Sequence, residues 1–494
     1  MRVERRILLN TVVLGSGELV GQLANFGFVV LLARRFGVEI FGWYAFAMAL
    51  GAVLSPLVSL GGITYLTREL ARQPDRAAAL FAAMRPVQLT SGFVVWLVMA
   101  LVALVIDIPA REALVVVIVG TYHVLQRAAA LFLVPSLAQQ KMSLPAVVGG
   151  GHRVIFAALA AIAIFLGFDA PAVLVAMPVA ALSSLVVAWL YARRGSQVPA
   201  GSIEEVSRSA LIRASLPFLG TALLAVIYNR GGILLLTALR GEVATGLFSV
   251  ADRLLVPIWM ITGTFVSAVF PALARLAEDR DRMREIGQRS TRLLLLVTIP
   301  LATLLAVFAE DVTTIVFGPA LRSAAPVLAT LAPLAVARSM SNLWMWHCVA
   351  VGDEHAAALA KSRAVIGFFV LATVGILAAG AIGLAIAILS AELFLAGNLR
   401  RILKGHGQHE PLWPAARGVI AGAACAVLVA VMLSALALPG RVAVVVGTMA
   451  IATILFGAIQ GHDLRFFLEI ARGDRTDAAL GREKLPPAET AGRD

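Results

Sequence analysis

The sequence predicts an all-α polytopic membrane protein with about fourteen transmembrane helices, and three observations lead to this prediction. The 494 residues are 60% hydrophobic. Only 14% of them are charged, against about 25% in a typical soluble protein. Apolar stretches of about twenty residues, the length of a membrane-spanning helix, recur along the chain. Lipid offers backbone amides no hydrogen-bond partners, so each stretch is expected to be a helix.

Fourteen apolar segments are predicted as spans. In chain order they are 11–33, 40–65, 86–106, 113–137, 145–167, 171–191, 212–238, 244–274, 291–309, 326–351, 363–380, 382–399, 415–437 and 441–460. The first follows a basic start but is too long for a signal-peptide core, so we expect it to stay uncleaved. Prolines inside spans, Pro333 among them, predict kinks.

The order of spans predicts the domain organisation. The polar stretch Gly195–Ile212 is the best central linker, with six spans before it. We therefore expect an N-terminal lobe over 1–200, a C-terminal lobe over 201–405 and two further helices over 406–460. The remainder, 461–494, is predicted to be a largely disordered cytoplasmic tail, because it is polar and rich in Arg, Asp and Pro.

An internal repeat supports two lobes. The segment from Gly37 to Gly42, before the second span, resembles the segment from Gly241 to Gly246, before the eighth. The same spacing places Asn25 on Asn229 in the first span of each half. Repeats of this kind commonly form two lobes with a substrate path between them.

The net charge of +12 reports topology. Basic residues are concentrated in alternate connections, for example within 68–85 and 275–292, and in both termini. Positive charge marks the cytoplasmic side, so both termini are predicted to be cytoplasmic. The charge indicates contact with anionic membrane lipids and not with nucleic acid. Cys348 and Cys425 both fall within spans and form neither a disulfide framework nor a metal site.

Four arginines fall inside predicted spans: Arg127, Arg230, Arg253 and Arg338. A charged side chain at the centre of a spanning helix costs roughly 2.5–3.5 kcal/mol. Arginine stays protonated, so each needs an anionic partner or water. With few intramembrane acids to match them, we predict a hydrated, electropositive cavity whose guanidinium groups suit phosphate oxygens.

Polar residues accompany these arginines at helical spacing. They are His123 beside Arg127, Asn342 beside Arg338, Asp252 next to Arg253, and Glu18, Gln22 and Asn25 along the first span. Glu18, Asp252 and His123 are candidates for coupling to H⁺ or Na⁺. No cofactor is expected.

Several of these residues have structural alternatives. Arg253 could pair with Asp252 or Glu18 and only lock helices together, and Glu18 could equally be the partner of a buried arginine. Arg127 and Arg230 could snorkel to the membrane surface. Glu392 is expected to interact with nearby helices and is given little functional weight. Gly17 and Gly21 predict close helix packing.

Local motifs add a resemblance to a known family. They include Leu32-Ala-Arg-Arg-Phe-Gly37, Phe41-Gly42-Trp-Tyr44, Ile227-Tyr-Asn-Arg230, Ala251-Asp-Arg253 and Phe317-Gly-Pro319. Together they resemble the polysaccharide/oligosaccharide flippase family of the multidrug/oligosaccharidyl-lipid/polysaccharide exporter superfamily, over roughly residues 8–400.

The resemblance implies two six-helix lobes, two extra helices and alternating access. It implies that undecaprenyl-pyrophosphate-linked oligosaccharides move from the inner to the outer leaflet, and that Arg230, Arg253 and Arg338 match the family's cationic cavity. Members often carry an acidic residue soon after the Tyr-x-Arg of span seven, where this chain has Gly231-Gly232. A coupling role for that carboxylate therefore does not transfer.

The sequence thus predicts a bacterial inner-membrane flippase for cell-surface polysaccharide biosynthesis, such as lipopolysaccharide or exopolysaccharide, and not an enzyme. Its expected partners are the lipid-linked oligosaccharide, membrane lipids and other polysaccharide-assembly proteins. The alternatives are a peptidoglycan lipid-precursor flippase, a cation-coupled multidrug antiporter of the same superfamily and a non-transporting assembly partner. A membrane glycosyltransferase would need a large loop with acidic catalytic residues, which the short connections do not provide.

Overall fold

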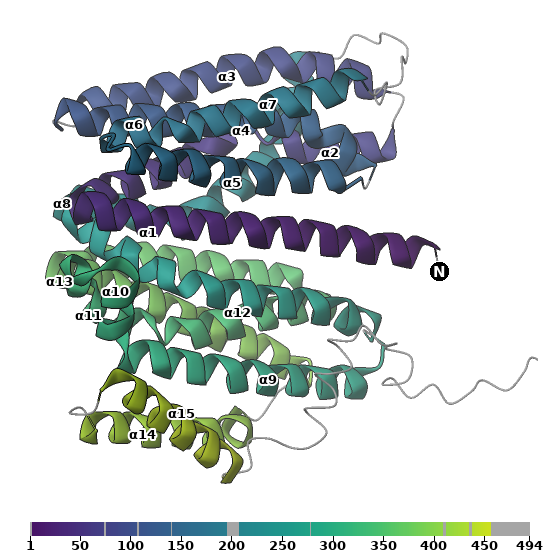
Figure 1. Ribbon diagram of the computed structural model, residues 1–494. Coiled ribbons are helices and arrows are strands. Elements are labelled where there is room, and N and C mark those ends of the chain that lie inside the picture. Colours follow the sequence, from purple (N-terminus) through teal and green to yellow (C-terminus); the bar gives the residue numbers. More distant parts are fainter. Residues whose placement is uncertain are drawn as a thin grey trace, which may run out of the picture. The chain divides into compact units, whose positions relative to one another are not determined.

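The computed structural model describes residues 2–73, 76–105, 108–139, 141–194, 207–276, 278–408, 412–433 and 437–455. Most of the predicted central linker and the predicted tail lie outside these residues. Within them every regular element is a helix (Figure 1). The elements are α1 (Arg2–Ser59), α2 (Gly62–Arg72), α3 (Ala77–Val105), α4 (Ala110–Ala138), α5 (Ser143–Phe165), α6 (Ala170–Leu174), α7 (Ala176–Arg194), α8 (Arg208–Arg275), α9 (Arg280–Val307), α10 (Ala309–Phe317), the 3₁₀ helix η2 (Pro319–Ala324), α11 (Ala325–Leu331), α12 (Leu334–Ala350), α13 (Glu354–Gly405), α14 (Leu412–Met432) and α15 (Leu438–Leu455).

Three of these helices are too long for one membrane crossing. The 52 residues of α13 would span about 78 Å as one helix, more than twice the hydrocarbon core. Each long helix contains a backbone break, at Gly37 in α1, Gly241 in α8, and Ala379 and Gly380 in α13. These breaks coincide with the predicted boundaries between spans, so each long helix makes two crossings.

The remaining crossings are single helices or bent pairs. By length and composition, eight helices among the described residues can cross a membrane, or nine if the bent η2–α11 and α12 pair is one span. That pair bends by 44° beside Pro333, as the proline predicts. With the three broken helices counted twice, the bent pair counted once, and α14 and α15 added, the described elements supply the fourteen predicted crossings. The all-α polytopic fold is confirmed.

The chain divides into two compact units. Unit 1 comprises Met1–Arg253, Thr313–Val327 and Ala372–Leu384, and unit 2 comprises Leu254–Val312, Leu328–Leu371 and Ala385–Asp494. In unit 1, α3, α4, α5 and α7 form a bundle of roughly parallel helices, and α5 lies against α1 (Figure 1). Its outward side chains include Leu104 and Phe165, which are 80% and 84% exposed. Such exposed apolar side chains are typical of a lipid-facing surface.

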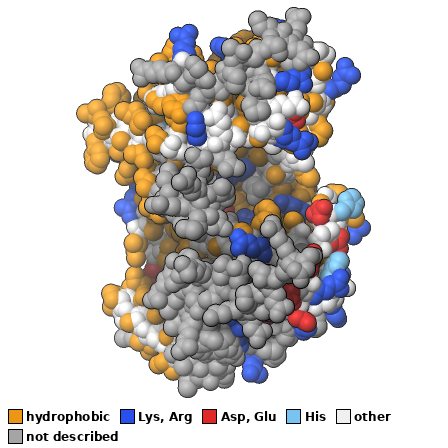
Figure 2. Space-filling view, turned by 90° about the vertical axis from the view of Figure 1, so that its right-hand side faces the viewer, with side chains coloured by type: hydrophobic (Ala, Val, Ile, Leu, Met, Phe, Trp, Pro, Cys, Tyr) orange, Lys and Arg blue, Asp and Glu red, His pale blue; other side chains and the backbone are white. Residues whose placement is uncertain are grey.

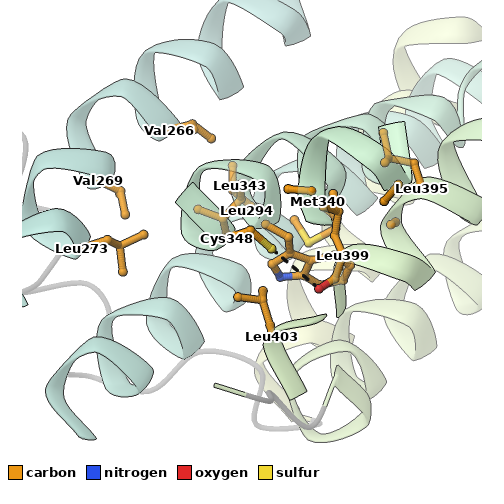
Figure 3. Close-up of a cluster of buried hydrophobic side chains, with 14 of the residues drawn as sticks. Val266, Val269, Leu273, Leu294, Met340, Leu343, Cys348, Leu395, Leu399 and Leu403 are labelled. Carbon is orange, nitrogen blue, oxygen red and sulfur yellow. Dashed lines mark hydrogen bonds between the residues drawn. The ribbon is translucent and has the colours of Figure 1, made fainter. Parts of the chain in front are cut away.

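Unit 2 has its own apolar core (Figure 3). α8 contributes Val266, Val269 and Leu273, and α13 contributes Leu395, Leu399 and Leu403, to a cluster that includes Leu294 of α9 and Met340, Leu343 and Cys348 of α12. The Cys348 thiol points toward the Leu399 carbonyl oxygen at 3.9 Å, a weak donor contact within the core. The burial of this thiol fits a packing role. α14 and α15 pack together beside α9.

The two copies of the repeat predicted from the sequence share the same backbone conformation at their glycines. Gly37 has φ 81° and ψ −178°, and Gly241 has φ 79° and ψ −175°. Only glycine adopts this region readily, because a side chain there meets the backbone. The same residue type therefore breaks α1 and α8 at equivalent positions in the same way.

The two halves also meet at a reciprocal glycine contact within unit 1. A Cβ atom added to Gly42 would lie 1.9 Å from the backbone oxygen of Glu242, and one added to Gly246 would lie 2.3 Å from the oxygen of Val38. Val38 and Glu242 are equivalent positions of the repeat, as are Gly42 and Gly246. The lack of side chains at both glycines allows the two backbones to approach this closely.

Two arginines that lie between predicted spans, Arg34 and Arg240, cap helix ends. Arg34 donates from Nε to the Val316 carbonyl at 2.8 Å and from Nη2 to the Ile315 carbonyl, in the last turn of α10. Arg240 makes the same kind of fork on the carbonyls of Ile376 and Leu377, just before the break in α13. A cation at the carboxyl end of a helix is stabilised by the helix dipole.

Candidate functional site

The candidate site begins with Arg127, which is half-buried on α4. Its Nε donates to the Ser55 hydroxyl of α1, and its own carbonyl accepts a 2.5 Å hydrogen bond from Gln88 of α3. Its recorded side-chain partner is thus a hydroxyl and not a carboxylate. Arg127 keeps its full positive charge inside the helix bundle.

His123, one turn before Arg127, lies against the backbone of Gly51 on α1. A Cβ at Gly51 would lie 2.1 Å from His123 Cδ2, so only glycine leaves room for the ring. Among the described residues, the buried Nε2 atoms of His123 and Gln126 have no hydrogen-bond partner. Buried polar atoms in this state are unusual and are consistent with a site that binds a polar ligand or water.

Arg230 and Arg253 approach the same region from the two halves of α8. Both guanidinium groups act electrostatically on the Tyr44 hydroxyl of α1, and Arg230 also acts on His123. Tyr44 is fully buried, and its hydroxyl has no hydrogen-bond partner among the described residues. We call Arg127, Arg230 and Arg253 the cation cluster. The sequence grouped these three residues with Arg338, and it did not identify the tyrosine that Arg230 and Arg253 share.

The residues beside the cation cluster are placed as follows. Asp252 is half-buried, and as the immediate neighbour of Arg253 on one helix it does not face it. Asn229 is exposed and donates to the Ala225 carbonyl at 2.7 Å. Asn25, its equivalent in the first half, is half-buried on α1.

Glu18 has a partner that differs from the one considered in the sequence analysis. Its carboxylate lies 2.7 Å from Arg153 of α5 and accepts a hydrogen bond from Gln22 at 2.8 Å. Arg153 lies within the α5 helix. Gly17 packs against Gly150, which confirms the predicted close approach at this point of α1. The pair therefore joins α1 to α5.

Arg338 belongs to unit 2 and has an acidic partner there. Its Nε lies 3.0 Å from Oε1 of Glu392 on α13, and its Cζ lies 5.1 Å from the centre of the Trp259 ring of α8. Ser341 donates to the other Glu392 oxygen at 2.6 Å. Asn342, one turn from Arg338, is half-buried. Glu392 was expected only to interact with nearby helices, although an acid inside a span is itself a signal of function.

Basic residues mark one end of the helices. Arg68, Arg72, Arg76 and Arg85 are all exposed, at the end of α2 and the start of α3. Figure 2 looks onto the end of the helices at which the N-terminus lies, and Lys and Arg side chains gather at several places on it. This agrees with the charge pattern, and the assignment of this end to the cytoplasm stays a prediction.

Bundled apolar helices of membrane-spanning length, with arginines among them, define a polytopic membrane protein. The family model described as "Polysaccharide biosynthesis protein" matches residues 7–277. The chain belongs to this family.

Solved structures show the same fold. The inward closed conformation of the lipid II flippase MurJ matches with a TM-score of 0.71 and 11% identity, over 92% of this chain and 100% of that one. An inward-facing multidrug resistance MATE family transporter of the MOP superfamily matches with a TM-score of 0.50 and 15% identity, over 81% and 96%. No curated protein matches the chain. At these identities the likeness concerns the fold alone.

Proposed function

We propose that this protein is a flippase that moves a lipid-pyrophosphate-linked oligosaccharide across the bacterial inner membrane by alternating access, for cell-surface polysaccharide biosynthesis. The observation that supports this most is the cation cluster. Guanidinium groups donate paired hydrogen bonds to phosphate oxygens. Inside a membrane such charges are screened less than in water, so they attract a pyrophosphate strongly.

The remaining site residues receive supporting roles in this proposal. Arg338 is a further phosphate ligand, and Asn25, Asn229 and Asn342 are polar companions for the head group. The lipid tails stay in the bilayer while the head group crosses. Glu18, Asp252 and His123 remain the candidates for coupling to H⁺ or Na⁺.

Two other transport functions make different predictions. A peptidoglycan precursor flippase would use the same cations on another lipid-linked pyrophosphate, and its loss would stop growth. A multidrug antiporter for cationic drugs would be opposed by the cation cluster, because like charges repel in a weakly screened site.

Transport in proteoliposomes tests the proposal directly. The Arg230→Ala, Arg253→Ala double variant is expected to lower the flipping rate of a fluorescent lipid-pyrophosphate oligosaccharide about tenfold or more, because charge-assisted hydrogen bonds contribute about 1.5–3 kcal/mol each. The matched controls are Arg68→Ala and Arg363→Ala, which remove exposed arginines of the same charge. A double variant that flips the lipid at the wild-type rate would contradict the proposal.

A further inference from the structure

One face of α12 is turned away from the core of unit 2. Trp344 and Cys348 are buried in that core. Arg338, Asn342 and Trp346 follow one another at intervals of four residues, which places them on the same side of a helix. The Arg338 side chain is 29% exposed, Asn342 is half-buried and Trp346 is 41% exposed. The accessible face of α12 thus carries a cation, an amide and an aromatic ring in a row.

The position of Trp346 on this face is informative. A tryptophan near the end of a span commonly anchors the helix at the membrane surface, and Trp346 taken alone would fit that role. A charged side chain within a span, however, faces the interior of the bundle or a water-filled path. Trp346 shares its side of the helix with Arg338 and Asn342. We therefore expect the exposed indole to face the same polar path as the guanidinium, and not the lipid.

Helix α8 contacts this row at both of its ends. The Trp259 ring lies over the guanidinium of Arg338, with 5.1 Å from Cζ to the ring centre. Phe270, eleven residues further along α8, contacts Trp346, and the two ring centres are 4.7 Å apart with their planes tilted by 54°. The two helices therefore follow the row in the same direction. The cation is at one end and a pair of aromatic rings is at the other.

Between its two aromatic residues, α8 carries little side-chain bulk. Gly263 and Ser267 follow Trp259 at four and eight residues and precede Phe270, so all four lie along one side of the helix. A Cβ atom added to Gly263 would have no described atom within 4 Å. Ser267 is exposed, and its hydroxyl donates to the Gly263 carbonyl at 2.9 Å. Open space is thus present beside Gly263, where a ligand can approach the backbone.

The order of these groups matches a phosphate with a sugar attached to it. A guanidinium suits phosphate oxygens, and an amide bonds to hydroxyl groups. The C–H groups on the face of a pyranose ring are weakly positive, so they pack on the electron-rich face of an aromatic ring. Arg338 and Trp346 are separated by eight residues, or about 12 Å along the helix. A sugar whose phosphate is held at Arg338 therefore extends along α12 towards Trp346.

We propose that Trp346, supported by Phe270, is the platform on which the glycan of the substrate stacks, and that Asn342 bonds to hydroxyl groups of the same glycan. The inference rests on the proposed function, because it takes the substrate to be a sugar on a lipid pyrophosphate. The platform gives the glycosylated lipid an attraction that the bare carrier lipid lacks. It is thus a specificity determinant that keeps the bare carrier from competing for the cations.

Binding of two lipids to the purified full-length protein tests this proposal. One probe is a short polyprenyl pyrophosphate that carries N-acetylglucosamine. The other carries a methyl group in place of the sugar, so both probes have the same charge. Wild type is expected to bind the sugar-bearing probe about tenfold more tightly. Trp346→Leu keeps an apolar side chain without a ring and is expected to lose this preference, whereas Trp346→Phe is expected to keep most of it.

The two probes separate failure of this inference from failure of the proposed function. If Trp346→Leu weakens binding of both probes alike, or of neither, Trp346 is no sugar platform and the inference falls, while the flippase proposal stands. If wild type binds neither probe, the proposed function fails as well. The matched control is Phe93→Leu, which removes an exposed aromatic ring of α3 and is expected to leave both affinities unchanged.

A second variant covers the case in which Trp346→Leu does not fold. Gly263→Leu places a side chain in the open space between the two aromatic residues of α8, so it is expected to weaken binding of the sugar-bearing probe and not of the methyl-capped one. Its matched control is Gly367→Leu on α13, where an added Cβ also has no described atom within 4 Å. Equal effects of the two substitutions on the sugar-bearing probe would overturn the inference.

Discussion

At the scale of single residues, two carboxylate–arginine pairs inside the helices differ in burial. Glu392 is 4% exposed and its Arg338 partner 29%, whereas Glu18 is 50% exposed and its Arg153 partner 27%. Water can screen the second pair through its half-exposed carboxylate. The carboxylate of the first pair is shielded from water, so its attraction to the guanidinium is screened less.

This difference predicts unequal effects on stability. Glu392→Ala removes the buried counter-charge of Arg338 and is expected to destabilise the protein by up to about 3–5 kcal/mol. Glu18→Ala is expected to cost about 1 kcal/mol or less, as for other solvent-accessible pairs. Thermal unfolding of the two variants in the same detergent measures the contrast. Equal losses would mean that burial does not set the strength of these pairs.

The same residues show the limits of prediction from the sequence. Helical spacing grouped neighbours such as His123 and Arg127. The two carboxylates, however, pair with arginines that are distant in the sequence. Glu392 lies 54 residues from Arg338, and Glu18 lies 135 residues from Arg153. Such pairs depend on how helices rotate and pack against each other, which hydropathy does not encode. A buried acid with no local partner was the signal available in the sequence, at Glu392.

At the scale of elements, glycine breaks turn three long helices into six crossings. The sequence did predict these boundaries, because Gly37 and Gly241 interrupt the apolar stretches at matching places. Hydropathy finds the membrane-crossing lengths well since the bilayer itself imposes them. It does not predict that Arg34 and Arg240, next to the breaks in sequence, cap distant helices.

Substitution at the two breaks tests their backbone requirement. Gly37→Ala and Gly241→Ala are each expected to destabilise the protein by about 1–3 kcal/mol, because their φ and ψ angles suit glycine alone. The matched controls are Gly27→Ala and Gly263→Ala, which lie in helical parts of α1 and α8 with no atom within 4 Å of an added Cβ. These controls are expected to leave thermal stability unchanged or slightly raised. Loss of stability in the controls of the same size would refute the special role of the breaks.

At the scale of the whole molecule, the reciprocal contact of Gly42 and Gly246 joins the first and second repeats of the chain within unit 1. Gly42 faces the backbone oxygen of Glu242, and Gly246 faces the backbone oxygen of Val38. The two substitutions Gly42→Ala and Gly246→Ala are therefore expected to have similar effects. Either one forces the same two helix segments apart.

A double-mutant cycle measures this dependence. Because the same widening of the gap between the two helix segments accommodates both added methyl groups, the double variant is expected to lose little more stability than either single variant. The expected interaction free energy between the two substitutions is about 0.5–3 kcal/mol. Gly220→Ala, with open space around an added Cβ, serves as the control. Strictly additive losses would show that the two glycines act as independent contacts.

The reciprocal contact also has a consequence for the origin of the chain. Val38 meets Gly246 as Glu242 meets Gly42, so the contact has the form of an interface between two identical partners. Consider a half-length polypeptide with six crossings and one such glycine. Two copies of it, related by a twofold axis, would form this glycine–backbone contact twice. Fusion of two such genes would preserve the contact without any adaptive change. After such a fusion the two halves would be free to diverge elsewhere, as the unmatched arginines at 34 and 240 illustrate.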